Sequence, residues 1–241
     1  DTTYYGVDLY GERRLAPLLR RLAALPGVEW VRLHYTYPTG FPVEVMEAMR
    51  EESKICRYID IPLQHIADRQ LSAMRRGITK QGTEELIARL RREVPGIAIR
   101  TTLLVGFPGE SEADFAELME FVERQRFERL GVFPYSAEEG TPSAEMADDV
   151  PEEVKQERVE RVMELQRNIS LEANAAKVGR RLRVVVDRRE GDYYVARSEY
   201  DSPEVDQEIL LPAEGERLVP GEFREVVVTA CEEYDLYGRL A

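Results

Sequence analysis

Strand-like and helix-like segments alternate along residues 28–136, and this alternation is the feature that most constrains the fold. Four segments rich in β-branched and aromatic residues read as strands, at 28–37, 58–63, 97–105 and 130–135. Consecutive strands separated by helices require crossover connections, so the pattern predicts a parallel sheet in an α/β fold. The apolar runs at 58–63 and 97–105 agree with this prediction, because the strands of a parallel sheet are buried on both faces.

Polar or small residues lie at or just past the end of each predicted strand. In chain order they are Thr36, the pair Gln64 and His65, the run 106–110, and Tyr135. Barrel enzymes place their chemistry at the carboxyl ends of the strands. The pattern therefore favours a partial β/α barrel, although an open sheet would satisfy the alternation as well.

A long charged helix follows a linker that is rich in small and acidic residues. We expect the helix to begin at Pro151, a favourable first helical position, and to run to about Lys177, before Gly179. Its apolar stripe is formed by Val154, Val162, Leu165 and Ile169.

The last part of the chain reads as a small all-β domain. Short strands separated by Gly, Asp and Pro turns are predicted at 182–186, 193–197, 208–211, 224–229 and 236–240. Such a series predicts a small closed barrel of the OB-like kind. The predicted organisation is a partial barrel at 1–136, a linker with a connecting helix at 137–177, and the β domain at 178–241.

The first residues, Asp-Thr-Thr-Tyr-Tyr-Gly at 1–6, read as the end of a strand whose beginning is missing. We therefore expect the chain to be a piece of a longer enzyme, with the reactive centre in the missing part. The alternative from a different functional class is a stand-alone binding module with a degenerate barrel and no catalysis.

Composition and charge limit the cellular compartment and the class of binding partner. No apolar run approaches the ~20 residues that a membrane helix needs, and no signal peptide is visible. Cys56 and Cys231 lie far apart, which argues against a disulfide framework and for the cytoplasm. The net charge of −13 argues against a large nucleic-acid surface and suits a basic protein partner, although acidity for solubility explains it equally well.

Two motifs are candidates for ligand contact. In Gly106-Phe-Pro-Gly-Glu-Ser, glycine would allow a ligand to approach the backbone; the alternative is a tight turn, with Ser111 and Asp114 starting a helix as a capping box. The side-chain amide of Gln64 could hydrogen-bond a ribose, whereas His65 could instead cap the following helix. Two histidines in the whole chain argue against a hydrolytic metal centre, so no metal ligands are assigned.

Several segments together resemble the radical S-adenosylmethionine (SAM) methylthiotransferases. They are residues 1–11, 32–38, 58–65, 100–110, 130–136, 192–194, 201–206 and 233–238. The resemblance is strongest to the members that methylthiolate the β-carbon of an aspartate in ribosomal protein uS12. It implies the C-terminal part of a radical SAM partial barrel followed by a TRAM domain.

The resemblance also implies the cofactors. The full-length enzyme would use SAM and two 4Fe–4S clusters, and its N-terminal domain and three-cysteine loop would precede Asp1. Neither Cys56 nor Cys231 matches a cluster ligand, so this chain alone is expected to bind no cluster and to be inactive. No catalytic residue is assigned. The residues matched to the cofactor are Asp1 and Thr2 for its methionyl amine, Gln64 and His65 for its ribose, and Val105, Gly106, Val132 and Tyr135 for its adenine.

Charge separates two branches of this family. From Lys177 onward the chain has 10 Lys and Arg against 15 Asp and Glu, a balance of −5. A tRNA methylthiotransferase, the alternative within the family, would need a basic surface for a phosphate backbone. The acidic balance instead suits basic uS12 as the partner, and nucleic acid is disfavoured.

Overall fold

The computed structural model describes residues 1–215 and 217–241. They form two compact units, residues 1–166 and residues 167–241, and each unit is described by itself. Helix α7, Glu152–Ala175, belongs with its first part to the first unit and with its last part to the second.

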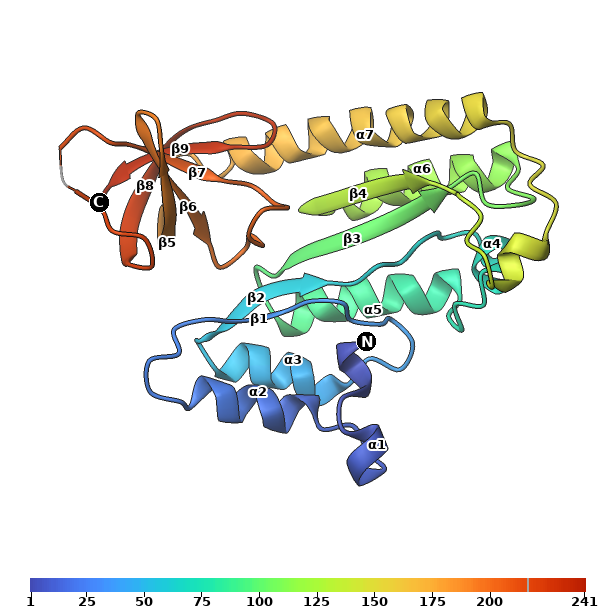
Figure 1. Ribbon diagram of the computed structural model, residues 1–241, viewed down its shortest axis with the longest axis horizontal. Coiled ribbons are helices and arrows are strands. Elements are labelled where there is room, and N and C mark those ends of the chain that lie inside the picture. Colours follow the sequence, from blue (N-terminus) through green and yellow to red (C-terminus); the bar gives the residue numbers. More distant parts are fainter. Residues whose placement is uncertain (216) are drawn as a thin grey trace. The chain divides into compact units, whose positions relative to one another are not determined.

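The first unit is built on a sheet of four parallel strands in chain order (Figure 1). The strands are β1 (Val31–Leu33), β2 (Ile55–Asp60), β3 (Ala98–Val105) and β4 (Arg129–Pro134). The α/β fold and its parallel sheet are confirmed.

Two strand boundaries differ from the predicted ones for local reasons. β1 ends at Leu33 rather than at residue 37, because Tyr35 has a φ of 54°, a left-handed conformation that extended strands do not contain. β2 ends at Asp60, two residues before Pro62, which has no N–H for a ladder hydrogen bond.

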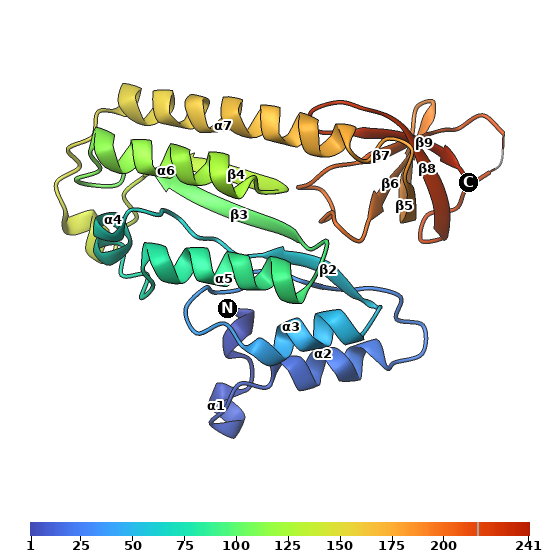
Figure 2. The ribbon, with the colours of Figure 1, turned by 180° about the vertical axis from the view of Figure 1, so that it is seen from behind.

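Helices connect the strands and cover the sheet. The longer ones are α2 (Leu15–Ala23), α3 (Val43–Glu51), α5 (Lys80–Glu93) and α6 (Glu112–Gln125). The shorter ones are α1 (Val7–Tyr10), α4 (Asp68–Ala73) and the 3₁₀ turns η1 (Thr2–Tyr4) and η2 (Pro142–Glu145). Both views show α5 and α6 along one face of the sheet (Figure 2).

The beginning of the chain is not a strand end. The Asp1 carboxylate accepts a hydrogen bond from the Thr3 N–H at 2.9 Å, which starts the 3₁₀ turn η1. This corrects the interpretation of residues 1–6, because a short capping residue favours a turn over an extended segment here.

The capping box predicted at the start of α6 is confirmed. The Ser111 side chain accepts from the Asp114 N–H, and the Asp114 carboxylate accepts from the Ser111 N–H at 2.8 Å. Burial alone would raise the pKa of Asp114, but hydrogen bonds from Arg69 and Ser111 outweigh it and lower the pKa to about 2.

We expect Asp114→Asn to remove a pH-dependent part of the stability. The Asp114 pKa lies at about 2 in the folded chain against an ordinary 3.8, so its stabilisation is present above pH ~4 and is lost as the pH falls toward 2. The variant should lose about 1 kcal/mol of unfolding free energy at pH 6. Urea unfolding of both chains between pH 2 and pH 6 measures this. A difference between them that stays constant with pH would contradict the assignment.

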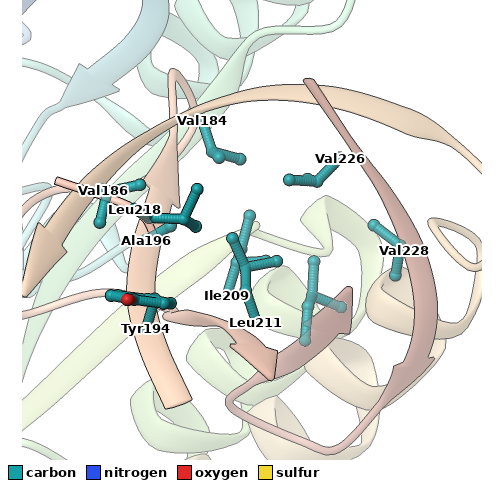
Figure 3. Close-up of a cluster of buried hydrophobic side chains, with 10 residues drawn as sticks. Val184, Val186, Tyr194, Ala196, Ile209, Leu211, Leu218, Val226 and Val228 are labelled. Atoms are coloured by element: carbon teal, nitrogen blue, oxygen red, sulfur yellow. The ribbon is translucent and has the colours of Figure 1, made fainter. Parts of the chain in front are cut away.

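The second unit contains the predicted closed five-stranded barrel, with strand order β5-β6-β7-β9-β8. Its strands are β5 (Arg181–Glu190), β6 (Tyr193–Ser198), β7 (Ile209–Pro212), β8 (Phe223–Cys231) and β9 (Leu236–Leu240). Figure 3 shows aliphatic side chains from these strands filling the interior, together with Tyr194 and Leu218. The end of α7 is tied to this barrel by Asn174, whose side-chain N–H groups donate to the carbonyls of Glu232 and Glu233 at 3.0 and 3.1 Å.

Neither cysteine is in a disulfide: Cys56 is buried in β2 and Cys231 is half-buried at the end of β8. Within the described part of the chain, no helix is both long enough and apolar enough to cross a membrane.

Candidate functional site

A cavity of about 640 Å³ lies beyond the carboxyl ends of β2, β3 and β4. Its lining includes Gln64, Arg75, Arg76, Leu104, Phe107 and Tyr135. The volume is within the range of ~300–1,000 Å³ that small-molecule sites occupy, and this end of the strands is where barrel enzymes bind ligands.

Gln64 reaches the cavity because the sheet continues past β2 without regular strand geometry. Its φ is 72°, its N–H donates to the Thr102 carbonyl at 2.9 Å, and its own carbonyl accepts from Leu104 at 2.8 Å. The backbone is therefore satisfied by β3. A half-buried side-chain amide lines the cavity, where it can donate and accept hydrogen bonds.

Tyr135 supplies an aromatic wall that is held from two sides. Its hydroxyl donates to the Ser143 carbonyl at 2.9 Å, and its ring meets Phe107 edge-on with centroids 5.1 Å apart. Its N–H donates to the Val105 carbonyl at 2.8 Å, which extends the pairing of β3 and β4. Fixed aromatic faces of this kind suit a flat ligand such as a purine.

Arg76 is a cavity residue that the sequence reasoning missed. Its guanidinium donates to the Pro62 carbonyl at 2.6 Å and lies over the Tyr37 ring, 4.6 Å from the centroid. Its Nε is buried without a hydrogen-bond partner in the described structure. Burial lowers the pKa of Arg76, with Tyr37 acting in the opposite direction. A cation fixed in this way is suited to binding a carboxylate.

His65, in contrast, points away from the cavity into a buried network. Its Nδ1 accepts from the N–H of Ala67, the residue before α4, at 3.0 Å, but among the described residues it makes no capping hydrogen bond to the first turn of the helix, so neither role predicted for His65 is established. Its Nε2 lies 3.6 Å from Oε2 of Glu110, and both side chains are fully buried. The same Glu110 oxygen accepts from the Gly106 N–H at 2.8 Å.

The space beside Gly106, where a ligand was expected, is occupied by the side chain of Lys155. Its φ is 72°, and a Cβ at this position would stand 2.3 Å from Cγ of Lys155. The side-chain direction is thus filled by a lysine stem from α7. Close approach of a ligand to the Gly106 backbone from another direction stays a prediction.

The remaining cofactor-matched residues lie outside the lining of the cavity. Thr2 binds the carboxyl end of β1, with its hydroxyl donating to the His34 carbonyl at 3.0 Å, and Asp1 caps the turn before it. Val105 and Val132 are buried within β3 and β4. The structure therefore brings Gln64 and Tyr135 together at the cavity, and the other six matched residues do not line it.

Residues 1–215 and 217–241 contain no group of three or more His, Cys, Asp or Glu side chains that could hold a metal ion. The buried Asp60 is engaged instead by Arg100, whose guanidinium donates to it at 3.0 Å, and by the Tyr35 N–H. The donors in the described residues therefore do not fit an iron–sulfur cluster.

Two family models match the chain. Residues 3–122 match the radical SAM superfamily, and residues 178–241 match the TRAM domain. The fold agrees with that of coproporphyrinogen III oxidase (HemN) from Escherichia coli, a radical SAM enzyme, with a TM-score of 0.51 and 15% identity over 77% of this chain and 50% of that one. The first unit is thus a radical SAM fold, and a TRAM domain follows it.

Curated relatives give the finer placement. The chain is 55% identical over 242 residues to ribosomal protein uS12 methylthiotransferase RimO from Porphyromonas gingivalis, and 51% identical over 241 residues to RimO from Bacteroides thetaiotaomicron. It belongs to the radical SAM methylthiotransferase family. All of the chain is covered in both comparisons, but it spans only 56% and 55% of these relatives, about half their length.

Proposed function

We propose that the chain is the cofactor-binding and substrate-docking part of an enzyme that methylthiolates an aspartate of ribosomal protein uS12. The observation that carries the proposal is its 51–55% identity, along its whole length, to proteins named for that reaction. The cavity at the carboxyl ends of the strands supports the proposal, because barrel enzymes bind their ligands at this end. The reaction would take place in the cytoplasm, where ribosomal proteins are found and cysteines stay reduced.

SAM is the ligand that we assign to this cavity, and its lining residues support the assignment. Gln64 can hydrogen-bond the ribose, Tyr135 and Phe107 offer aromatic surface to the adenine, and Arg76 can pair with the carboxylate. When bound, SAM supplies the radical precursor and the methyl group. The residues of this chain bind and orient it and exclude water, which is the usual contribution of the protein to cofactor chemistry.

The iron–sulfur clusters would be held elsewhere in the enzyme. The donors in the described residues do not fit a cluster, so we expect the isolated chain to be inactive. The chain would bind the cofactor in its cavity and dock the substrate.

The decisive experiment uses the full-length enzyme with its clusters reconstituted anaerobically. Incubation with SAM, a one-electron reductant such as dithionite, a sulfur source and purified uS12 should add one methylthio group to an aspartate, detected by mass spectrometry of uS12 peptides. Unmodified tRNA serves as the competing substrate in a parallel reaction. Methylthiolation of tRNA but not of uS12 would replace the proposed substrate by the family's alternative one.

We expect charge reversal on the TRAM domain to slow docking of uS12. Glu232→Lys with Glu233→Lys should lower the association rate roughly 3–10-fold at low salt, because complementary charge mainly accelerates association. The difference should shrink at physiological salt, where screening acts over ~8–10 Å. Stopped-flow or surface-plasmon measurements at two salt concentrations test this. Asp235 is kept because it accepts from the Glu208 N–H and burial raises its pKa.

A matched control carries the same change of charge on the first unit. Glu120 and Glu123 are exposed on α6, so Glu120→Lys with Glu123→Lys alters net charge without touching the TRAM domain. Equal slowing by both double variants would show that overall charge, and not a docking surface on the TRAM domain, controls association.

A further inference from the structure

Two cations of α7 are buried in the first unit. Lys155 and Arg158 are each 3% exposed, and their spacing of three positions places them on one face of the helix, one above the other. A buried charge is costly unless it is paired and hydrogen-bonded, and apolar side chains at such positions are often at least as stabilising. Two buried cations side by side therefore call for an explanation beyond packing.

Arg158 holds the turn that follows β3. Its guanidinium donates to Oε1 of Glu110 at 2.8 Å, and the other oxygen of that carboxylate accepts from the Gly106 N–H at 2.8 Å. The Glu110 side chain is fully buried, and Arg158 is its ion-pair partner there. One side chain of α7 thus fixes the backbone that leads from β3 past the cavity.

The same carboxylate connects this turn to the residue after Gln64. His65 lies with Nε2 3.6 Å from Oε2 of Glu110. Gln64 lines the cavity and its neighbour His65 is buried outside the lining, so a displacement of Glu110 would affect the turn after β3 and the packing of His65. Through Glu110, Arg158 is thus hydrogen-bonded to the turn after β3 and lies near the segment that follows β2.

Lys155 contacts Tyr135, the residue that follows the end of β4. Its stem fills the space beside Gly106, and its ammonium lies 5.4 Å from the centroid of the Tyr135 ring. Asp148 holds that ammonium with an Oδ2–Nζ distance of 2.6 Å. Tyr135 is the aromatic wall of the cavity, and Lys155 supports it from the side of α7.

We propose that Lys155 and Arg158 are positioning residues for the SAM cavity, which makes the first part of α7 a component of the cofactor site. The proposal rests on the proposed function, because it assumes that this cavity binds SAM. Neither residue lines the cavity; both act through Glu110, Gly106 and Tyr135. Fixed geometry at such supporting contacts is what keeps a binding site preorganised.

Arg158→Met in the full-length, cluster-loaded enzyme is the main test. We expect the Kd for SAM, from equilibrium dialysis, to rise about tenfold, with the KM for uS12 unchanged. Arg158→Lys should recover part of the affinity, since an ammonium can still pair with Glu110. Arg161→Met is the matched control: Arg161 is exposed on the same helix, and its guanidinium carbon lies 4.7 Å from the Phe115 ring centroid, against 5.2 Å for Arg158.

A second variant and the possible outcomes for the wild-type enzyme complete the test. If Arg158→Met does not fold, Lys155→Met, which keeps a stem over Gly106, carries the comparison and should weaken SAM binding about threefold. Variants that fold and bind SAM as tightly as the wild type would overturn the proposal. A wild-type enzyme that binds SAM but leaves uS12 unmodified would refute the proposed substrate alone, and the binding comparison would still decide on Arg158. A wild-type enzyme that binds no SAM would overturn both.

Discussion

Gly106→Val should lower the free energy of unfolding of this chain by roughly 3–5 kcal/mol, since a strained left-handed backbone and an overpacked core each cost about 1–3 kcal/mol. The φ of Gly106 is 72°, and a Cβ there would meet Cγ of Lys155 at 2.3 Å. Valine adds two methyl groups in the same buried space. Urea unfolding of the variant and the wild type, followed by circular dichroism, measures the loss.

Gly109→Ala separates the two costs. Gly109 has a φ of 78°, but the nearest atom to a Cβ there is Nη1 of Arg69 at 3.6 Å, an ordinary contact. This variant should therefore lose only the backbone part, about 1 kcal/mol. Gly106→Ala should lose more, and adding Lys155→Ala to it should restore part of the loss. Equal destabilisation by Gly106→Ala and Gly109→Ala would show that the lysine stem simply moves aside.

The strands were predictable because their signals are local. β-branched runs bounded by Gly and Pro located β3 and all five strands of the TRAM barrel to within a few residues. The exceptions have local causes that spacing does not reveal. Tyr35 takes a left-handed conformation, and its N–H donates to the buried Asp60 carboxylate at 3.0 Å, a partner that comes 25 residues later in the chain.

The residues of α7 that support the cavity, Lys155 and Arg158, could not be predicted from hydrophobic periodicity. The apolar stripe assigned to α7 was Val154, Val162, Leu165 and Ile169, yet in the first unit the buried positions of this helix are Lys155, Arg158, Val162 and Gln166. Three of these four are polar. Hydrophobic spacing finds faces that are buried because they are apolar, and it misses a face that is buried because its charges are paired.

Arg76 could not be assigned to the site from the sequence for a related reason. It follows Arg75 at the end of a short helical segment, where a pair of arginines most often forms a solvated surface. Its partners are the Pro62 carbonyl and the Tyr37 ring, which are 14 and 39 residues away in the chain. Only the fold distinguishes the half-buried arginine at the cavity from its exposed neighbour.

Arg76→Gln should weaken SAM binding by the full-length enzyme about 10–100-fold, the largest effect expected from a single change in the cavity. A charge-assisted hydrogen bond contributes ~1.5–3 kcal/mol, and each 1.4 kcal/mol is a factor of ten in affinity. The glutamine keeps a polar side chain but is two atoms shorter, so the change removes the charge and the fork of donors together with the contacts to the Pro62 carbonyl and the Tyr37 ring. Equilibrium dialysis with labelled SAM measures the effect, and S-adenosylhomocysteine, which keeps the carboxylate, should lose affinity in parallel.

The neighbouring arginine provides the control for Arg76. Arg75 also lines the cavity and carries the same charge, but it is exposed. Arg75→Gln changes the net charge of the site equally, so a general electrostatic attraction would make the two variants alike. Carboxylate recognition by the fixed guanidinium predicts instead that Arg75→Gln costs less than threefold and that adenosine, which has no carboxylate, binds the Arg76→Gln variant as it binds the wild type. If adenosine and SAM lose affinity equally in Arg76→Gln, the guanidinium shapes the cavity as a whole and does not bind the carboxylate.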